Sequence, residues 1–216
     1  MSIVRPLFAL ALGACFLGLN GCGGGGETPL PAPPAPAPEM PTRAPVPLTS
    51  GITIGTPAWP EGSSASGATG PTPMAGVSCL VNESYHVHAH ISLFKDGVQL
   101  AVPANIGLRG CAFELHTHDE SGIVHVETNV AKPFTLGQFF AVWGHELNAT
   151  GVAGMQGNVE VWVTDEGKAP AKVTGFAGPA DFAAARAVEL VQHREIAIVV
   201  GARPAALPTY TWTGGY

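Results

Sequence analysis

The stretch YHVHAHISLF, residues 85–94, decides the fold and also raises the question of function. Apolar and polar residues alternate along it, which is the pattern of a β-strand with one face toward a core. The apolar face carries Tyr85, Val87, Ala89, Ile91 and Leu93, and the other face carries His86, His88, His90 and Ser92. The next residues, KDG (95–97), are typical of a hairpin turn, and VQLAVP (98–103) supplies a return strand.

A second histidine-rich stretch, LHTHDESGIVHVET, occupies residues 115–128. We expect a strand over residues 111–118, a four-residue loop DESG, and a return strand over residues 123–128. In this hairpin Val124 and Val126 would point to the core, and the polar residues between them would point away from it. The histidines of both stretches therefore belong to the polar face of one sheet.

The length of the loop sets which side chains of this hairpin meet. With a four-residue loop, antiparallel pairing places His116 opposite His125 and Glu114 opposite Glu127. A tighter turn would instead pair His118 with His125 and His116 with Glu127. Both loops keep the three histidines and the two glutamates on one face of the sheet, whereas a loop with an odd number of residues would not.

The rest of the folded region adds strands and short helices. FTLGQFFAVWG (134–144) predicts a helix, because Thr135 and Gln138 form a capping box and Gly144 suits its C-terminal end. Further strands are expected at VEVWV (159–163), REIAIVV (194–200) and YTWT (210–213), and a short helix capped by Asp181 at residues 181–190. The sequence therefore predicts a mainly β domain over residues 76–216, an antiparallel sheet with one or two short helices.

The first 22 residues have the pattern of a secretory signal, with Arg5 before an apolar run that closes in small residues. The closing LNGC resembles a bacterial lipobox, which implies that Cys22 is acylated and becomes the N-terminus. LGAC, ending at Cys15, is a second candidate that would leave a shorter apolar region. We therefore expect a cell-envelope protein, anchored to a membrane through an N-terminal lipid. Gly23 after the cysteine implies the outer membrane if the organism is Gram-negative.

Residues 23–75 are rich in Gly, Pro and Ser, and residues 23–73 hold thirteen of the twenty prolines. Such a composition buries too little apolar surface to offset the entropy of ordering, so it predicts a flexible tether. Ile52, Ile54 and Trp59 are the residues of this segment that we expect to dock on the domain.

The charge and the cysteine content limit the possible partners and the possible roles of the cysteines. The formal charge is −6 and the ten Lys and Arg are scattered, which argues against a nucleic acid partner. Cys79 and Cys111 are the two cysteines of the predicted domain. In an oxidising compartment such a pair forms a disulfide more often than two free thiols or two metal ligands.

Six of the eight histidines fall within the forty residues from His86 to His125. Histidines two apart on a strand can share an ion, but His86 and His90 are about 13 Å apart on a regular strand, so a site needs a neighbouring strand. We expect His116, His118 and His125 to form the centre of a metal site. The other candidate ligands and bases are His86, His88, His90, Glu114, Asp119 and Glu127, with His145 in reserve and His193 as a turn residue.

Imidazole and carboxylate ligands suit Zn, Cu(II), Fe or Ni, and the four methionines are too dispersed for a Cu(I) carrier, so Zn or Cu is expected. The leading hypothesis is a protein that stores, senses or delivers this metal. A metal-dependent enzyme of the hydrolase, lyase or oxygenase type is the alternative, with Glu114, Asp119 or Glu127 as general base. The third hypothesis is an interaction module whose histidines only form the polar face of a sheet.

Several segments together, HVHAH, LHTHDESGIVHVE and FTLGQFFAVWG above all, resemble an uncharacterised family of secreted or lipid-anchored, histidine-rich bacterial proteins. The resemblance spans most of residues 76–216. It implies that these segments form one domain of a cell-envelope protein, and it carries no activity with it.

Overall fold

The structure is a computed structural model that describes residues 40–62, 67–173 and 182–216. These residues belong to one compact unit, Ala37–Tyr216. The predicted signal sequence, Cys22, the first part of the predicted tether and the Asp181 cap lie outside the described residues.

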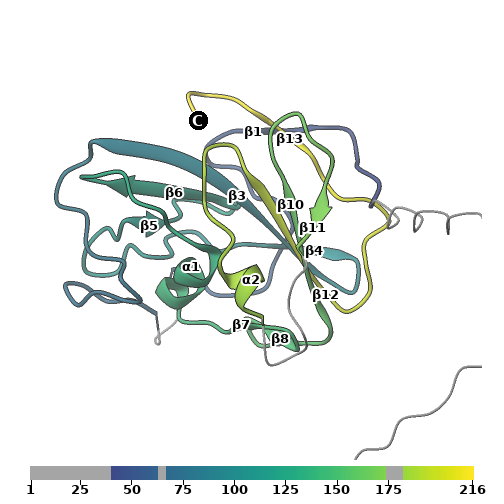
Figure 1. Ribbon diagram of the computed structural model, residues 1–216, viewed down its shortest axis with the longest axis horizontal. Helices are drawn as coiled ribbons and strands as arrows, with labels where there is room; N and C mark the ends of the chain where they lie inside the picture. Colours follow the sequence, from purple (N-terminus) through teal and green to yellow (C-terminus); the bar gives the residue numbers. More distant parts are fainter. Residues whose placement is uncertain (1–39, 63–66, 174–181) are drawn as a thin grey trace, which may run out of the picture. The chain divides into compact units, whose positions relative to one another are not determined.

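A mixed sheet forms the centre of this unit (Figure 1). Its strands within the described residues are β2 (Thr56–Pro57), β3 (Tyr85–Lys95), β4 (Val98–Ala101), β5 (Leu115–His116), β6 (Ile123–Thr128), β10 (Val159–Thr164), β11 (Ala171–Lys172) and β12 (Glu195–Val200). Two smaller sheets are formed by β1 (Val46–Leu48) with β13 (Tyr210–Trp212), and by β7 (Leu147–Asn148), β8 (Gly151–Val152) and β9 (Met155–Gln156). The helices described are α1 (Leu136–Trp143) and α2 (Ala183–Arg186). The prediction of a mainly β fold with one or two short helices is confirmed.

The long strand β3 organises the sheet. It pairs antiparallel with β4 and with β6, each along a different part of its length, and β6 in turn pairs antiparallel with β5. Its pairing with β12 is parallel, as is that of β2 with β4, so the sheet is mixed rather than antiparallel throughout. The order β12–β3–β6–β5 brings the two histidine-rich stretches side by side.

Helix α1 begins and ends as its sequence predicts. The Thr135 side chain accepts from the Gln138 amide, the Gln138 side chain accepts from the Thr135 amide, and Gly144 adopts a left-handed conformation at the C-terminal end. The helix buries Phe139, Phe140 and Trp143 among other residues against the sheet.

Both faces of β3 are covered. Its odd-numbered residues, such as Ala89 and Ile91, belong to the main core with α1. Its even-numbered face lies under segments from the two ends of the described chain, where β1 and β13 pair. In Figure 1 the helices lie below β3 and β6, and β1 and β13 lie above them. The histidine face is therefore largely buried, not the solvent-exposed face that alternation predicts.

The prediction of a flexible tether is wrong for residues 40–62 and 67–75. Leu48 is fully buried, and β1 and β2 pair with strands of the domain. Trp59 docks as expected: its indole N–H donates to the Ala153 carbonyl at 3.0 Å, and its ring forms a T-shaped contact with that of Trp143. A few buried apolar side chains and backbone pairs outweigh the entropy of ordering this segment.

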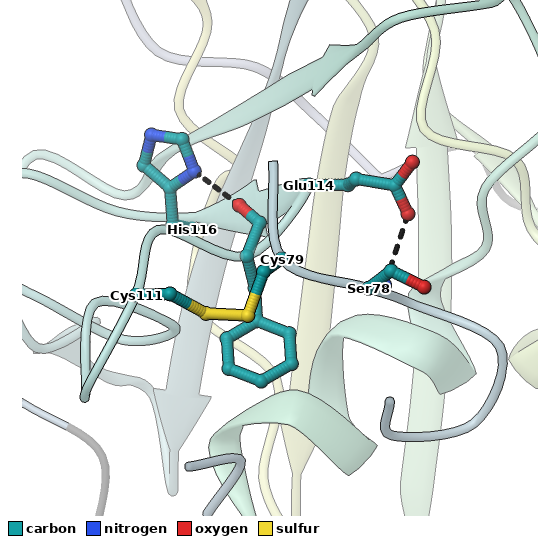
Figure 2. The surroundings of a disulfide bond; sticks show 6 residues. Ser78, Cys79, Cys111, Glu114 and His116 are labelled. Carbon is teal, nitrogen blue, oxygen red and sulfur yellow. Dashed lines mark hydrogen bonds between the residues drawn. A yellow bond between two sulfur atoms is a disulfide. The ribbon is translucent and has the colours of Figure 1, made fainter. Parts of the chain in front are cut away.

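The strand predicted over residues 111–118 is shorter, and β5 is only Leu115–His116. Before it the chain pairs with residues 78–80, since the Glu114 amide donates to Ser78 O and the Leu80 amide donates to Ala112 O. The predicted disulfide between Cys79 and Cys111 is confirmed and joins these two segments (Figure 2). The change of partner breaks the regular alternation just before the histidines.

Candidate metal centre

A row of histidines crosses three adjacent strands. His116 of β5 is paired with His125 of β6, which confirms the register predicted from a four-residue loop, and His125 is paired with His88 of β3. The next pair along the same face is Glu127 with His86. These side chains meet because directly opposed residues on neighbouring strands have Cβ atoms only about 4.5–5.5 Å apart.

The carboxylate of Glu127 stands among the imidazoles. Its Oε1 lies 3.3 Å from His86 Nε2 and 3.5 Å from both His116 Nε2 and His125 Nδ1. His116 Nε2 is 3.3 Å from His118 Nε2, and His86 Nε2 is 3.2 Å from His125 Nδ1. Ligand atoms at zinc distances of about 2.0–2.1 Å in a tetrahedron stand about 3.3–3.4 Å from one another. The spacing of neighbouring atoms in this cluster therefore matches that of ligand atoms around small cations.

Three groups of side chains within the described residues have ligand atoms that all lie within 4.8 Å of one another. The groups are His116, His118, His125 and Glu127; His86, His88 and His125; and Glu83, His86 and Glu127. The structure thus contains clusters of largely buried histidines that can hold a metal ion.

Hydrogen bonds outside the cluster orient two of the rings. His116 Nδ1 donates to the Phe113 carbonyl at 2.7 Å (Figure 2), and His86 Nδ1 lies 2.8 Å from Glu83 Oε1. A carbonyl or carboxylate can only accept, so Nδ1 carries the proton and Nε2 keeps its lone pair toward the cluster. Sequence reasoning missed Glu83, because it precedes β3 and takes no part in the alternation of that strand.

The environment keeps the central rings neutral. Burial, followed by the neighbouring histidines, lowers the pKa of His88 to about 4 and that of His125 to about 2. Burial also lowers the pKa of His116, although the Phe113 carbonyl and the charge of Glu127 oppose the shift. Neutral imidazole is the form that binds a metal.

His90 does not join the cluster, which differs from the prediction that includes it among the candidate ligands. Its Nε2 donates to the Ser121 carbonyl at 2.8 Å, and its ring lies 4.0 Å from that of Tyr210. It is two residues beyond His88, on the part of β3 that faces Ile123 rather than a histidine. The strand argument that His86 and His90 cannot share one ion agrees with this separation.

Glu114 and Asp119 also lie outside the three groups. Figure 2 shows Glu114 leaving the strand away from His116, because the irregular pairing before β5 turns it to the other side. There it accepts from Ser78 N, Thr128 Oγ1 and Lys132 Nζ. Burial raises its pKa, but these hydrogen bonds outweigh burial and lower it. Glu114, a predicted candidate ligand, therefore lies away from the imidazole cluster.

Asp119 holds the hairpin turn and a neighbouring segment in place. Its carboxylate accepts from the amides of Ser121 and Gly51, at 2.9 and 2.6 Å. The first bond closes the hairpin turn, and the second holds the segment after β1 against it. Among the candidate general bases, only Glu127 lies within the imidazole cluster.

The remaining histidines lie elsewhere. His145 packs against the Trp143 ring and belongs to none of the three groups. His193 adopts a left-handed turn conformation, stacks on Trp212 and has Nε2 3.1 Å from the Tyr216 carbonyl oxygen. The Tyr216 ring, which sequence reasoning did not consider, lies 4.8 Å from the His88 ring.

No family model, curated protein or solved structure matches this chain. The fold and the site together define the class of protein. It is a mainly β domain that carries a histidine-rich candidate metal centre on one face of its sheet.

Without metal, the domain is expected to lose stability as the pH falls from about 6.5 to 4. His88 and His90 have folded pKa values of about 4, and His125 of about 2, below the unfolded 6.5, so in this window the unfolded chain binds protons that the folded chain does not. Burial raises the pKa of Glu195 to about 7, which works in the opposite direction.

Urea unfolding of the metal-free protein at several pH values measures this loss. The Glu195→Gln variant is the matched comparison, since removal of the opposing carboxyl should make the decline toward acid steeper. A stability that is flat or rises between pH 6.5 and 4 would contradict the prediction.

Proposed function

We propose that this chain is a cell-envelope lipoprotein whose β domain binds a transition metal, Zn or Cu(II), for storage, sensing or delivery. The observation that carries the metal-binding part is the group His116, His118, His125 and Glu127, whose ligand atoms converge within 4.8 Å. Three imidazoles and one carboxylate form a complete tetrahedral set.

The chemistry of the ligands supports the choice of metal. Imidazole nitrogen suits Zn and Cu(II), whereas a softer Cu(I) site would need thiolates or thioethers. The two cysteines of the domain are joined in a disulfide and therefore supply no thiolate.

Binding is favoured over catalysis because the set leaves no open position. A catalytic zinc site keeps a fourth position for water, whereas this group fills all four with side chains. A cavity of about 460 Å³ has Tyr216 in its wall, but none of the four ligands lines it.

The envelope location rests on the sequence. The apolar leader, the lipobox-like end at Cys22 and the resemblance to secreted or lipid-anchored proteins all support it. Within the described part of the chain, no helix is long and apolar enough to cross a membrane.

The metal content of the purified full chain tests the proposal. After removal of metal and reconstitution with Zn or Cu(II), elemental analysis should find at least one ion per chain. The variant His116→Ala with His125→Ala should bind at least one ion fewer per chain, because loss of two of the four ligands of this group leaves too few for a stable site there. His145→Ala is the control and should bind as the parent does.

Two results would overturn this proposal. One is a parent chain that binds no stoichiometric metal after reconstitution. The other is a double variant that binds as much metal as the parent, which would place the ion elsewhere.

A further inference from the structure

We propose that the histidine face holds two metal ions side by side, the second bound by His86 and His88, with Glu127 and His125 shared between the two. His125 would bridge as an imidazolate, which releases its remaining ring proton to solvent and binds one ion through each ring nitrogen. This inference rests on the proposed function and adds a second site to it. The ions would be of the same class, Zn or Cu(II).

The width of the cluster exceeds the reach of one ion. His116 and His88 stand on the two strands that flank β6, so their backbones are two strand spacings apart, about 9–10 Å. The groups divide in the same way: His88 groups with His86 and His125, and His118 groups with His116, His125 and Glu127. Each ion would therefore lie between β6 and one of its two neighbours.

His88 gives an independent indication of a ligand. The residue is only 6% exposed, yet its buried Nε2 has no hydrogen-bond partner. Its ring centre lies 4.4 Å from that of His86 and 4.6 Å from that of His125. An unpaired buried polar atom is costly, and a cation bound between these rings would satisfy it.

The backbone around His88 is held independently of any metal. Its amide donates to Gln192 Oε1 and its carbonyl accepts from the His193 amide, both at 2.8 Å. The backbone that carries the ring is therefore fixed by the sheet and by the turn before β12. A preorganised ligand position favours binding because little further ordering is required.

His86 is also preorganised as a ligand. Glu83 holds its Nδ1, which leaves Nε2 3.2 Å from His125 Nδ1 and 3.3 Å from Glu127 Oε1. Glu127 Oε1 is also 3.5 Å from His116 Nε2, so the carboxylate stands between the two sets of histidines. A carboxylate has two oxygens and can bridge two cations, and Glu83 adds a second negative charge nearby.

Stoichiometry tests this inference with the full chain. Titration of the metal-free parent with Zn and with Cu(II) should reach two ions per chain. His86→Ala with His88→Ala should bind one, and His145→Ala should still bind two. In the Cu(II)-loaded parent the two ions should give an electron paramagnetic resonance spectrum with magnetic coupling, whereas the double variant should give that of an isolated ion.

A gentler variant guards against misfolding. Glu83 is exposed, so Glu83→Ala should leave the fold intact and weaken only the second ion, by roughly 10–100-fold, as loss of a group that orients a ligand does. If Glu83→Ala weakens both ions equally, or weakens neither, His86 is not a ligand of a separate second ion.

The outcomes separate the two proposals. One ion per chain in the parent overturns the second site and leaves the proposed function standing, whereas no ion in the parent overturns both. Two ions retained by the His86→Ala, His88→Ala variant would place the second ion elsewhere. No ion in that variant, if it is folded, would mean a single centre that needs all these residues.

Discussion

The Gly122→Ala variant is expected to lose about 2–4 kcal/mol of folding free energy, because alanine would be strained in its backbone conformation and would also collide with β3. Gly122 has φ 87°, and a Cβ at this position would meet the carbonyl oxygen of Ile91 and lie 2.9 Å from His90 Nε2. The Gly122 carbonyl also accepts from the Ile91 amide. The chain enters β6 here, so a shift would displace His125.

Gly154→Ala is the matched control. Gly154 has φ 84°, but a Cβ there would meet nothing within 4 Å. This variant should therefore lose only the folding free energy that corresponds to the backbone strain, about 1 kcal/mol. Urea unfolding of both variants measures the difference, and metal titration should show weakened binding for Gly122→Ala alone. If both variants lose the same free energy of unfolding, the contact of the added Cβ with β3 does not destabilise the fold.

The features that follow from local pattern could be predicted from the sequence. The alternation over residues 123–128 correctly placed Val124 and Val126 in the core and His125 on the other face. The length of the DESG loop gave the pairing of His116 with His125. The two ends of α1 could also be predicted, since each cap depends on residues within one turn of the helix.

The features that depend on distant segments could not be predicted. Residues 40–62 have the composition of a linker, and only the tertiary fold shows that Leu48 is buried on the domain. This cover, with the segment around Tyr210, turns an expected solvent-exposed histidine face into a buried one. The side on which Glu114 lies was missed for a similar reason: the chain before β5 pairs with residues 78–80, which no periodicity encodes.

Removal of the disulfide, by Cys79→Ser with Cys111→Ser, should lower the free energy of unfolding by about 3–4 kcal/mol, because it frees a long loop in the unfolded chain. The two cysteines are 32 residues apart in the sequence. Urea unfolding of the double variant measures the loss, and reduction of the parent should reproduce it. A loss below about 1 kcal/mol would mean that the unfolded chain keeps this loop largely closed without the bridge.

The same variant tests whether the disulfide supports the metal centre. Phe113, whose carbonyl accepts from His116 Nδ1, lies two residues after Cys111 and is paired with Cys79 (Figure 2). Loosening this segment should weaken the hold on the His116 ring, so metal affinity should fall by roughly tenfold while the content at saturating metal stays unchanged. His118 and Glu127 are not attached to this segment, so the site should persist. If metal affinity stays unchanged while the free energy of unfolding falls by the full amount, the bridge serves folding alone. If a folded variant binds less metal even at saturating concentration, the bridge is essential to the site.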